Sequence, residues 1–210
     1  MKIVVSYISS LYDYKKTINL IEKTSASGIH VDLMDGLYVG KLNFDDNLFA
    51  TLSNAKLPLD IHMMVKEPEK YLSKILLIKP ACVYIHPKTT ENINDIIENL
   101  KENNIEKGIA INPEDNVEDY IKLYKNVDRI LVMSVHPGKG GQKYLEETEK
   151  KLKQLKYLQK EYTFKIYVDG GINNDTIKYV KEYADGVVSG SYICNSIDFE
   201  KQIENLKLSL

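Results

Sequence analysis

The amino-acid sequence predicts an α/β fold, a single (β/α)₈ barrel of the TIM type that spans residues 1–210. Eight short apolar runs rich in Val and Ile recur along the whole chain, each bounded by turn residues. Continuous runs of this kind are typical of parallel strands that are buried on both faces. Most gaps between them carry helical periodicity, and no linker rich in Gly, Pro or Ser divides the chain. Strands that alternate with helices in this way favour one closed barrel.

The runs expected to form strands are Ile3–Ile8, Gly28–Met34, Leu59–Val65, Ala81–His86, Lys107–Ile111, Arg129–Val135, Lys165–Val168 and Gly186–Ser189. Apolar residues at spacings of three and four predict helices over Tyr14–Lys23, Asn92–Asn103, Val117–Tyr124, Leu145–Gln159 and Asp175–Tyr183. Pro68 is expected to start a further helix, and Asp175-Thr176 to cap the last one. Gly36–Lys56 has no clear period, so we expect a loop there, followed by a short helix.

An open, doubly wound sheet is the rival fold. That fold usually places a glycine-rich turn after its first strand. The corresponding segment here, Ser6–Leu11, contains no glycine, so the barrel is favoured.

The composition limits the kinds of partner and the cellular location that we expect for this protein. The formal net charge is −2, with acidic and basic residues interspersed, which gives no electrostatic case for nucleic acid or an anionic membrane. No apolar run approaches the roughly 20 residues that span a bilayer, and the start of the chain does not resemble a signal peptide. Cys82 and Cys194 stand far apart, as free thiols in a reducing compartment would. We therefore expect a cytoplasmic protein.

Metal-ligand residue types gather near the ends of the expected strands. His30 and Asp32 are two residues apart in one strand, so their side chains point the same way. His62 and Asp169 lie near the ends of other strands, and active residues of such barrels lie at these ends. Two imidazoles with one or two carboxylates suit Zn²⁺, Fe²⁺, Mn²⁺ or Co²⁺ better than Mg²⁺ or Ca²⁺. Simple hydrogen bonding in the barrel mouth would explain any one of these histidines, but their convergence favours a metal site. Asp35 falls on the opposite face and is expected to be a turn or capping residue.

Three late glycine-containing segments form a second group: Pro137–Gln142, Asp169–Gly171 and Ser189–Ser191. Each follows an expected strand, and the loops after the last two strands are the usual phosphate site of these barrels. Glycine lets backbone N–H groups approach an anion closely, and a following helix N-terminus would add a favourable dipole. We therefore expect a phosphate site here. Lys139 could contact the phosphate, although a solvated loop lysine explains it better.

The two groups together predict a small phosphorylated substrate held across the barrel mouth. Asp32 and Asp169 are expected on nearly opposite sides of the barrel, so a carboxylate could reach each face of that substrate. A cation that binds a carbonyl and the neighbouring hydroxyl acidifies the C–H between them and stabilises the enediolate. One carboxylate then removes a proton and the other returns one to the opposite face. The expected reaction is an epimerisation.

These residues resemble the ribulose-phosphate 3-epimerases, in order and over nearly the whole chain. The family pattern His-x-Asp-x-Met-Asp-Gly stands at 30–36, and Asp-x-His-x-Met-Val at 60–65. Val-Met-x-Val-x-Pro-Gly-x-Gly-Gly-Gln stands at 132–142, Val-Asp-Gly-Gly-Ile at 168–172 and Ser-Gly-Ser at 189–191. The resemblance implies a ribulose-phosphate-binding barrel that interconverts D-ribulose 5-phosphate and D-xylulose 5-phosphate. It also implies one divalent metal ion, Zn²⁺ or Fe²⁺ ahead of Mn²⁺ or Co²⁺, and a homo-oligomer.

The resemblance also implies roles for individual residues. Metal ligation falls to His30, Asp32, His62 and Asp169, with Asp32 as proton acceptor and Asp169 as donor in one direction. The residues implied to contact substrate are Ser6, Met34, His62, Met64, Met133, Gly138, Gly140, Gly141, Gly170, Gly171, Gly190 and Ser191.

Several positions depart from the family pattern. Val5 replaces the usual Pro, and Leu37-Tyr38-Val39-Gly40 replaces His or Arg followed by Phe-Val-Pro. Lys139 stands where Phe is usual. His86-Pro87-Lys88-Thr89 replaces His-x-Glu-Ala and is similar to the allulose-6-phosphate 3-epimerases, which act on a six-carbon sugar. None of these departures touches an expected metal ligand.

Two further alternatives belong to other classes of function. A lyase or decarboxylase on the same barrel would carry Asp-x-Lys-x-x-Asp where this chain has His-x-Asp-x-Met-Asp, without a lysine. A non-catalytic sugar-phosphate sensor would be expected to lack a carboxylate, yet Asp32 and Asp169 are both present. The epimerase is therefore favoured, with the pentulose substrate ahead of the hexulose.

Overall fold

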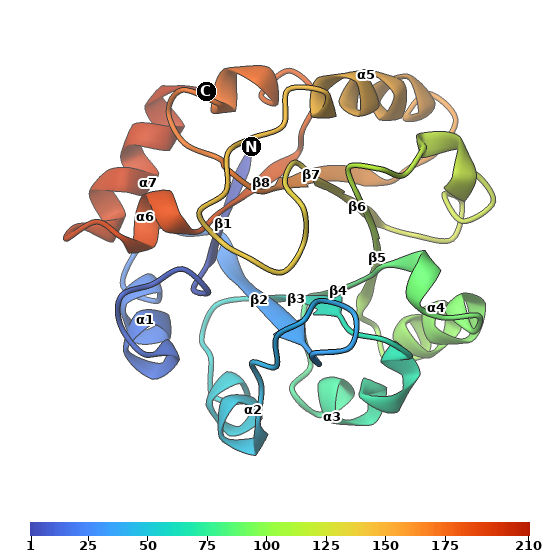
Figure 1. The fold of residues 1–210 in the computed structure, drawn as a ribbon, viewed down its shortest axis with the longest axis horizontal. Coiled ribbons are helices and arrows are strands. Elements are labelled where there is room, and N and C mark those ends of the chain that lie inside the picture. The colour runs from blue at the N-terminus through green and yellow to red at the C-terminus, as the bar shows by residue number, and fades with distance from the viewer.

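Eight parallel strands close into one barrel, each bonded to its neighbours in chain order, with β8 returning to β1. The structure, a computed structural model, describes all residues from Met1 to Leu210. Figure 1 shows the strands in the centre and the helices around them. The strands are β1 (Lys2–Ser6), β2 (Gly28–Met34), β3 (Leu59–Met64), β4 (Cys82–Ile85), β5 (Glu106–Ile111), β6 (Arg129–Met133), β7 (Lys165–Asp169) and β8 (Gly186–Ser189). The predicted barrel is confirmed, and every expected strand is present within two residues at each end.

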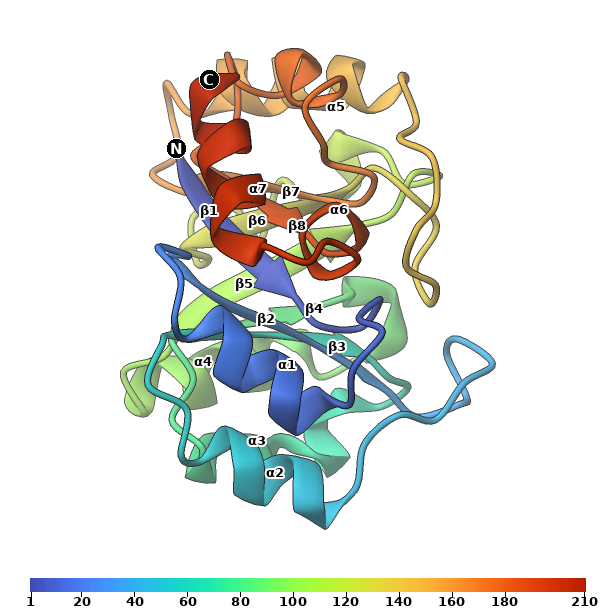
Figure 2. The same cartoon turned by 90° about the vertical axis from the view of Figure 1, so that its left-hand side faces the viewer.

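The helices cover the outside of the barrel, as the side view in Figure 2 shows. They are α1 (Tyr14–Ile21), α2 (Asp46–Leu52), α3 (Leu72–Leu77), α4 (Ile93–Glu102), α5 (Thr148–Leu158), α6 (Ser191–Cys194) and α7 (Phe199–Leu208). Four short 3₁₀ turns complete the set: η1 (Pro68–Lys70), η2 (Pro87–Thr89), η3 (Val117–Tyr120) and η4 (Ile177–Tyr179). The periodicity does not predict α6 and α7. None of the helices is long and apolar enough to span a lipid bilayer.

Two expected helices are largely wrong. Only η3 forms within Val117–Tyr124, and only η4 within Asp175–Tyr183. The expected cap at Asp175-Thr176 is also wrong, because Asn173 Oδ1 accepts hydrogen bonds from both of those backbone N–H groups. The Thr176 hydroxyl instead donates to the carbonyl of Gly171. These local side-chain bonds compete with the helical ladder and leave a turn in its place.

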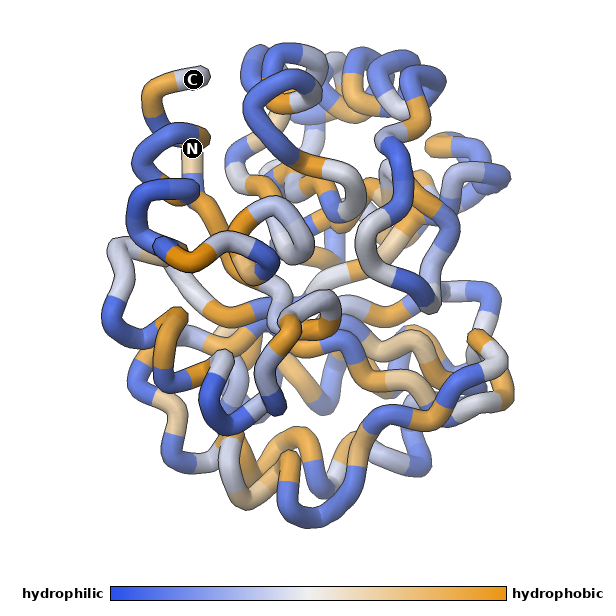
Figure 3. Tube along the Cα trace, turned by 60° about the vertical axis from the view of Figure 1, so that its left-hand side comes forward, coloured by the Kyte–Doolittle hydropathy of each residue, from blue (hydrophilic) through white to orange (hydrophobic).

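The core has two parts, one on each side of the sheet. Forty-six buried apolar residues fill the space between the strands and the helices, and nine more lie inside the barrel. Hydrophobic and hydrophilic residues alternate along the outer helices in Figure 3, and helix α4 contributes Ile96, Ile97 and Leu100 to the outer part. Tyr84 and Tyr167 fill much of the inside.

Each ring fits against a glycine on the adjacent strand, Gly108 of β5 beside Tyr84 and Gly186 of β8 beside Tyr167. A Cβ at Gly108 would lie 2.3 Å from Tyr84, and one at Gly186 would lie 2.3 Å from Tyr167.

A buried ion pair lies beneath the barrel centre. Arg129, the only arginine of the chain, donates to Asp60 Oδ2 at 2.9 Å and also pairs with Glu106. Its guanidinium lies 4.8 Å from the ring centre of Tyr167. Asp60 is two residues before His62 in β3, so this network supports the strand that carries a candidate ligand.

Strand register aligns the predicted site residues. Asp32 pairs with His62 and Met34 with Met64 across β2 and β3. Ser6 pairs with His30, and Met133 pairs with Asp169. Because parallel strands in register bring equivalent positions to one level, these side chains meet at the carboxyl end of the barrel.

Candidate active site

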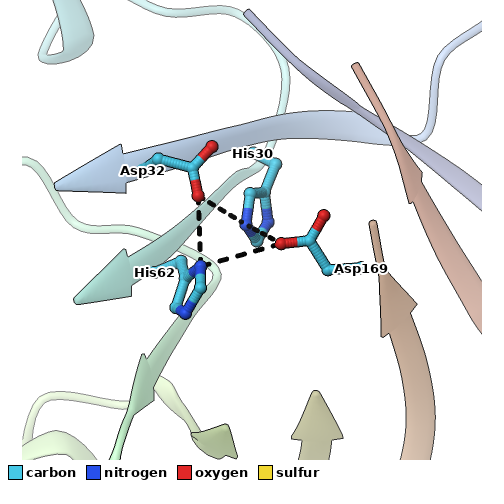
Figure 4. Close-up of side chains that lie close together, drawn as sticks. All are labelled: His30, Asp32, His62 and Asp169. Atoms are coloured by element: carbon cyan, nitrogen blue, oxygen red, sulfur yellow. Dashed lines mark hydrogen bonds and ion pairs between the residues drawn. The ribbon is translucent and has the colours of Figure 1, made fainter. Parts of the chain in front are cut away.

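Four side chains from three strands converge at this end of the barrel. His30 and Asp32 come from β2, His62 from β3 and Asp169 from β7, and Figure 4 shows all four pointing toward one another. One ligand atom of each lies within 4.8 Å of the others. Asp32 and Asp169 come from well-separated strands, yet their carboxylates meet in this cluster.

The distances surround one small space. Asp32 Oδ1 lies 3.4 Å from His30 Nε2 and 3.1 Å from His62 Nδ1. Asp169 Oδ2 lies 3.6 Å and 3.8 Å from the same two nitrogens. Each carboxylate therefore faces both imidazoles, as ligands of a common ion would.

The residues present fit a divalent cation. Both ring nitrogens of His30 are buried and have no hydrogen-bond partner in the protein. Because a buried polar atom without a partner is costly, this ring points to a ligand that is not part of the chain. Two imidazoles and two carboxylates form a mixed nitrogen and oxygen donor set of the kind that suits a divalent transition-metal ion.

The cluster perturbs its own proton affinities. Burial alone would lower the pKa of His30, but the charges of Asp32, Asp169 and Asp60 outweigh it and raise that pKa to about 9. Burial would raise the pKa of Asp32, yet the imidazoles of His30 and His62 hold it well below its usual range. For Asp169, burial and the charge of Asp32 outweigh the charges of His30 and His62 and raise the pKa. The pKa values of these two neighbouring carboxylates are therefore shifted in opposite directions, as they are for an ionised base and a protonated acid.

Ser6 holds the outer oxygen of Asp32. The Ser6 hydroxyl, at the end of β1, donates to Asp32 Oδ2 at 2.8 Å, while Oδ1 faces the histidines. The carboxylate is therefore held by both of its oxygens.

The predicted methionines fall into two groups. Met64 and Met133 line the cavity above the cluster, whereas Met34 is fully buried and does not reach the cavity wall. A contact between Met34 and substrate stays a prediction.

A cavity that is partly open to solvent joins the cluster to the glycine loops. Its wall includes Ser6, Asp32 and Asp169 on one side. The predicted glycines and serine complete it: Gly138, Gly140, Gly141, Gly170, Gly171, Gly190 and Ser191. None of these seven backbone N–H groups donates a hydrogen bond within the protein. Free N–H groups around one cavity form a cradle for an anion.

The expected contribution of helix dipoles is wrong for two of the loops. Helix α5 begins only at Thr148, and η4 is a single 3₁₀ turn. Helix α6 does follow Gly190 directly, but it is four residues long. The N–H groups themselves, together with left-handed backbone at Gly170 (φ 122°) and Gly171 (φ 64°), shape this cradle.

Neighbouring loops hold the glycine segment in place. A Cβ at Gly140 would lie 1.8 Å from the Ser9 hydroxyl, and one at Gly138 would lie 3.0 Å from Cβ of Val39. The Gln142 side chain donates to the carbonyls of His136 and Lys139. Sequence reasoning missed these contacts because they join loops from different strands.

The β2 loop is anchored at both ends. Asp35 accepts hydrogen bonds from the backbone N–H groups of Leu37, Tyr38 and Lys66, which confirms it as a turn residue. The Asn43 side chain bonds the backbone of Asp32 and Met34. Asn43 was also missed, because it lies in a segment without periodicity.

The departures from the family pattern lie in different places. Lys139 is exposed on the cavity wall. Lys88 pairs with Asp115 at 2.5 Å and does not line the cavity. His86 lies behind His62, where burial and the charge of His62 hold the pKa of His86 well below its usual range.

Comparisons with known proteins agree with the geometry. Residues 2–194 match the model of the "Ribulose-phosphate 3 epimerase family". The ribulose-phosphate 3-epimerase of Helicobacter pylori strain J99 is 34% identical, covering 99% of this chain and 97% of its own length. That of Bacillus subtilis strain 168 is 31% identical over 89% of this chain and 88% of its own.

Solved structures with lower identity share the fold. The tryptophan synthase alpha subunit of Campylobacter jejuni superposes with a TM-score of 0.68 at 18% identity, covering 98% of this chain and 94% of its own. The structure called KGPDC from Streptococcus mutans gives 0.70 at 13% identity, covering 99% and 96%. With the family match over nearly its whole length, this chain belongs to the ribulose-phosphate 3-epimerase family and is a sugar-phosphate epimerase.

Proposed function

We propose that this enzyme interconverts D-ribulose 5-phosphate and D-xylulose 5-phosphate, using two aspartates and one divalent metal ion within a domain that spans residues 1–210. The observation that carries the proposal is the pair of carboxylates beside the glycine-lined cavity. Asp32 has its pKa lowered and Asp169 has its pKa raised, so one is ready to take a proton and the other to give one. These pKa directions describe the side chains without a cation.

His30, His62, Asp32 and Asp169 would hold the ion. When bound, a divalent cation supplies positive charge that stabilises the oxyanions of an enediolate.

The aspartates supply the proton transfers. Asp32 accepts the proton from the carbon beside the carbonyl, and the electron pair left behind forms the enediolate. Asp169 donates its proton to the opposite face of the same carbon, which inverts it. Because Asp32 is then protonated and Asp169 ionised, the enzyme is set for the reverse reaction until solvent exchanges the protons. Ser6 keeps the Asp32 carboxylate oriented throughout.

The free N–H groups of the glycine loops would bind the phosphate and place the sugar between the two carboxylates. Met64 and Met133 would shield the reacting carbon from water. Lys139 is exposed beside the same loops and is not needed for this arrangement.

The observations favour the five-carbon substrate. The sequence similarity to the allulose-6-phosphate enzymes rests on the segment from His86 to Thr89, and neither His86 nor Lys88 lines the cavity. A lyase or decarboxylase is disfavoured because Lys139, on the outer loop, is the only lysine of the cavity wall.

We also expect a cytoplasmic location and a homo-oligomer. Cys82 and Cys194 are free and buried, as a reducing compartment allows.

The test is an assay of ribulose 5-phosphate and allulose 6-phosphate side by side, before and after removal of metal with a chelator. We expect faster turnover of the pentulose, loss of activity on chelation, and recovery when Zn²⁺, Fe²⁺, Mn²⁺ or Co²⁺ is restored. Equal or greater activity on the hexulose would overturn the substrate assignment. Full activity after thorough metal removal would overturn the metal.

A further inference from the structure

A line of hydrogen bonds runs outward from His62, on the side of its ring that faces away from the carboxylates. His62 Nε2 lies 2.8 Å from His86 Nε2, and His86 Nδ1 lies 3.3 Å from the Tyr38 hydroxyl. Asn112 Nδ2 donates to the same hydroxyl at 2.8 Å. His62, His86 and Asn112 are buried, and Tyr38 is half-buried. The line thus joins a candidate metal ligand to the loop formed by residues 36–42.

His86 has no other polar side-chain contact than these two. A neutral imidazole carries one proton, so one of its nitrogens donates and the other accepts. Two Nε2 atoms at 2.8 Å share a single proton, which belongs either to His62 or to His86. The position of that proton decides which atom of His62 is free for a ligand.

Only one order of protons leaves His62 Nδ1 free to hold a cation. His62 then carries its proton on Nε2 and donates it to His86 Nε2. His86 carries its own proton on Nδ1, and the atom within reach of that N–H is the oxygen of Tyr38.

In the opposite order Tyr38 donates to His86, His86 donates to His62, and His62 donates from Nδ1 to Asp32 Oδ1 at 3.1 Å. In that order His62 Nδ1 carries a proton and cannot bind a metal ion.

Because a hydroxyl both donates and accepts, Tyr38 can end the line in either order. Without its oxygen, the metal-binding order would leave the N–H of His86 buried and unpaired. The opposite order would leave only an acceptor unpaired. Unpaired buried N–H groups are the rarer and costlier of the two, so loss of the hydroxyl works against the order that binds metal.

We propose that His86 and Tyr38 are positioning residues that hold His62 in the tautomer with Nδ1 free, and so strengthen metal binding. The proposal rests on the metal site of the proposed function. Side chains that hydrogen-bond the far nitrogen of a histidine ligand fix its tautomer and orientation in this way. The Tyr38 hydroxyl belongs to the loop of residues 36–42, which lies beside the glycine segment that contains Gly138 and Gly140.

The test compares Zn²⁺ affinities of metal-free proteins by competition with a chromophoric chelator. His86→Leu is expected to weaken binding about 10- to 100-fold, the range for such outer partners. Tyr38→Phe should weaken it by a smaller factor of about 3 to 10, as loss of a single hydrogen bond would. His86→Gln is expected to retain part of the affinity, because its amide can accept from His62 and donate to Tyr38. Tyr157→Phe, at an exposed position of α5, is the matched control and should bind like the unaltered protein.

A second measurement determines which ring nitrogen of each histidine carries the proton. In the Zn²⁺-loaded protein, ¹⁵N spectra of the histidine rings are expected to place the proton of His62 on Nε2 and that of His86 on Nδ1. In metal-free Tyr38→Phe, the resonances of His86 should shift toward the other tautomer relative to those of the metal-free unaltered protein. A structural role alone would not move them.

Unchanged Zn²⁺ affinity in folded Tyr38→Phe and His86→Leu, together with an unchanged His86 tautomer in Tyr38→Phe, would overturn the inference and leave the metal site standing. Should His86→Leu fail to fold, Tyr38→Phe decides, because it removes a single oxygen from a loop residue. Failure of the unaltered protein to bind Zn²⁺ would instead overturn the metal site, and the inference with it.

Discussion

The hydroxyl of Ser6 donates a 2.8 Å hydrogen bond to Oδ2 of Asp32, the residue that we propose as the base. The two residues belong to adjacent strands, β1 and β2, and both line the cavity. The bond leaves Oδ1 of Asp32 facing both histidines. One small side chain therefore determines how the base is presented to substrate.

Ser6→Ala should reduce kcat by about 10- to 100-fold, because a misplaced catalytic group loses much of its effect. The fold should lose only about 1 kcal/mol with the hydrogen bond. Steady-state kinetics together with urea unfolding would check both values. Ser209→Ala removes a hydroxyl near the end of the chain and should leave kcat unchanged. Equal kcat in Ser6→Ala and the unaltered enzyme would contradict this role of Ser6.

Asp169→Asn should lower turnover by about 100- to 10,000-fold, the usual contribution of a general acid or base. The amide keeps the shape of the side chain, so the variant should remain folded by circular dichroism. Asp175→Asn, an exposed carboxylate a few residues further along, serves as control. Activity of Asp169→Asn within tenfold of the unaltered enzyme would mean that another group delivers the second proton.

The metal-free protein should lose stability as the pH rises. The pKa of His30 is raised to about 9 in the fold from an ordinary value of 6.5, so the folded chain holds this proton more tightly than the unfolded chain. The resulting stabilisation is complete below the unfolded value of 6.5 and is lost as the pH approaches 9. The loss should be on the order of 3 kcal/mol, from the size of the shift.

Urea unfolding of chelator-treated protein across this range would measure the loss. His30→Gln, which has no proton to release, should show a flatter profile. Zn²⁺ must displace the same proton, so its apparent affinity should rise with pH up to about 9. A profile of the unaltered protein that matches His30→Gln would refute the proton assignment.

Arg129→Met should destabilise the protein by about 3–5 kcal/mol, because it leaves Asp60 buried and unpaired inside the barrel. Lys74→Met removes a contact to Asp46 that is exposed at the surface, so it should destabilise the protein far less. The double variant Arg129→Met/Asp60→Leu should recover part of the loss, since both charges are then absent. Thermal unfolding would rank the three. A change in Arg129→Met no larger than in Lys74→Met would contradict the importance of this pair.

Local patterns of apolar residues in the sequence were sufficient to predict the barrel and its strands. Runs such as Gly28–Met34 are apolar enough to be buried on both faces, and their residues lie next to one another in the chain. The helices were predicted less well where polar side chains intervene. Around η4, Asn173 and Thr176 bond nearby backbone groups, and apolar spacing carries no information about that competition.

The sequence by itself determined the barrel, the residue types of the candidate metal site and the glycine loops, because each depends on residue types at short spacing within individual strands or loops. Only the tertiary structure decided that Ser6 holds Asp32, that Met34 lies away from the cavity, and that His86 and Tyr38 stand behind His62. Those relationships join different strands and loops. They depend on strand register and on the direction each ring takes within the closed barrel, which no spacing along the chain encodes.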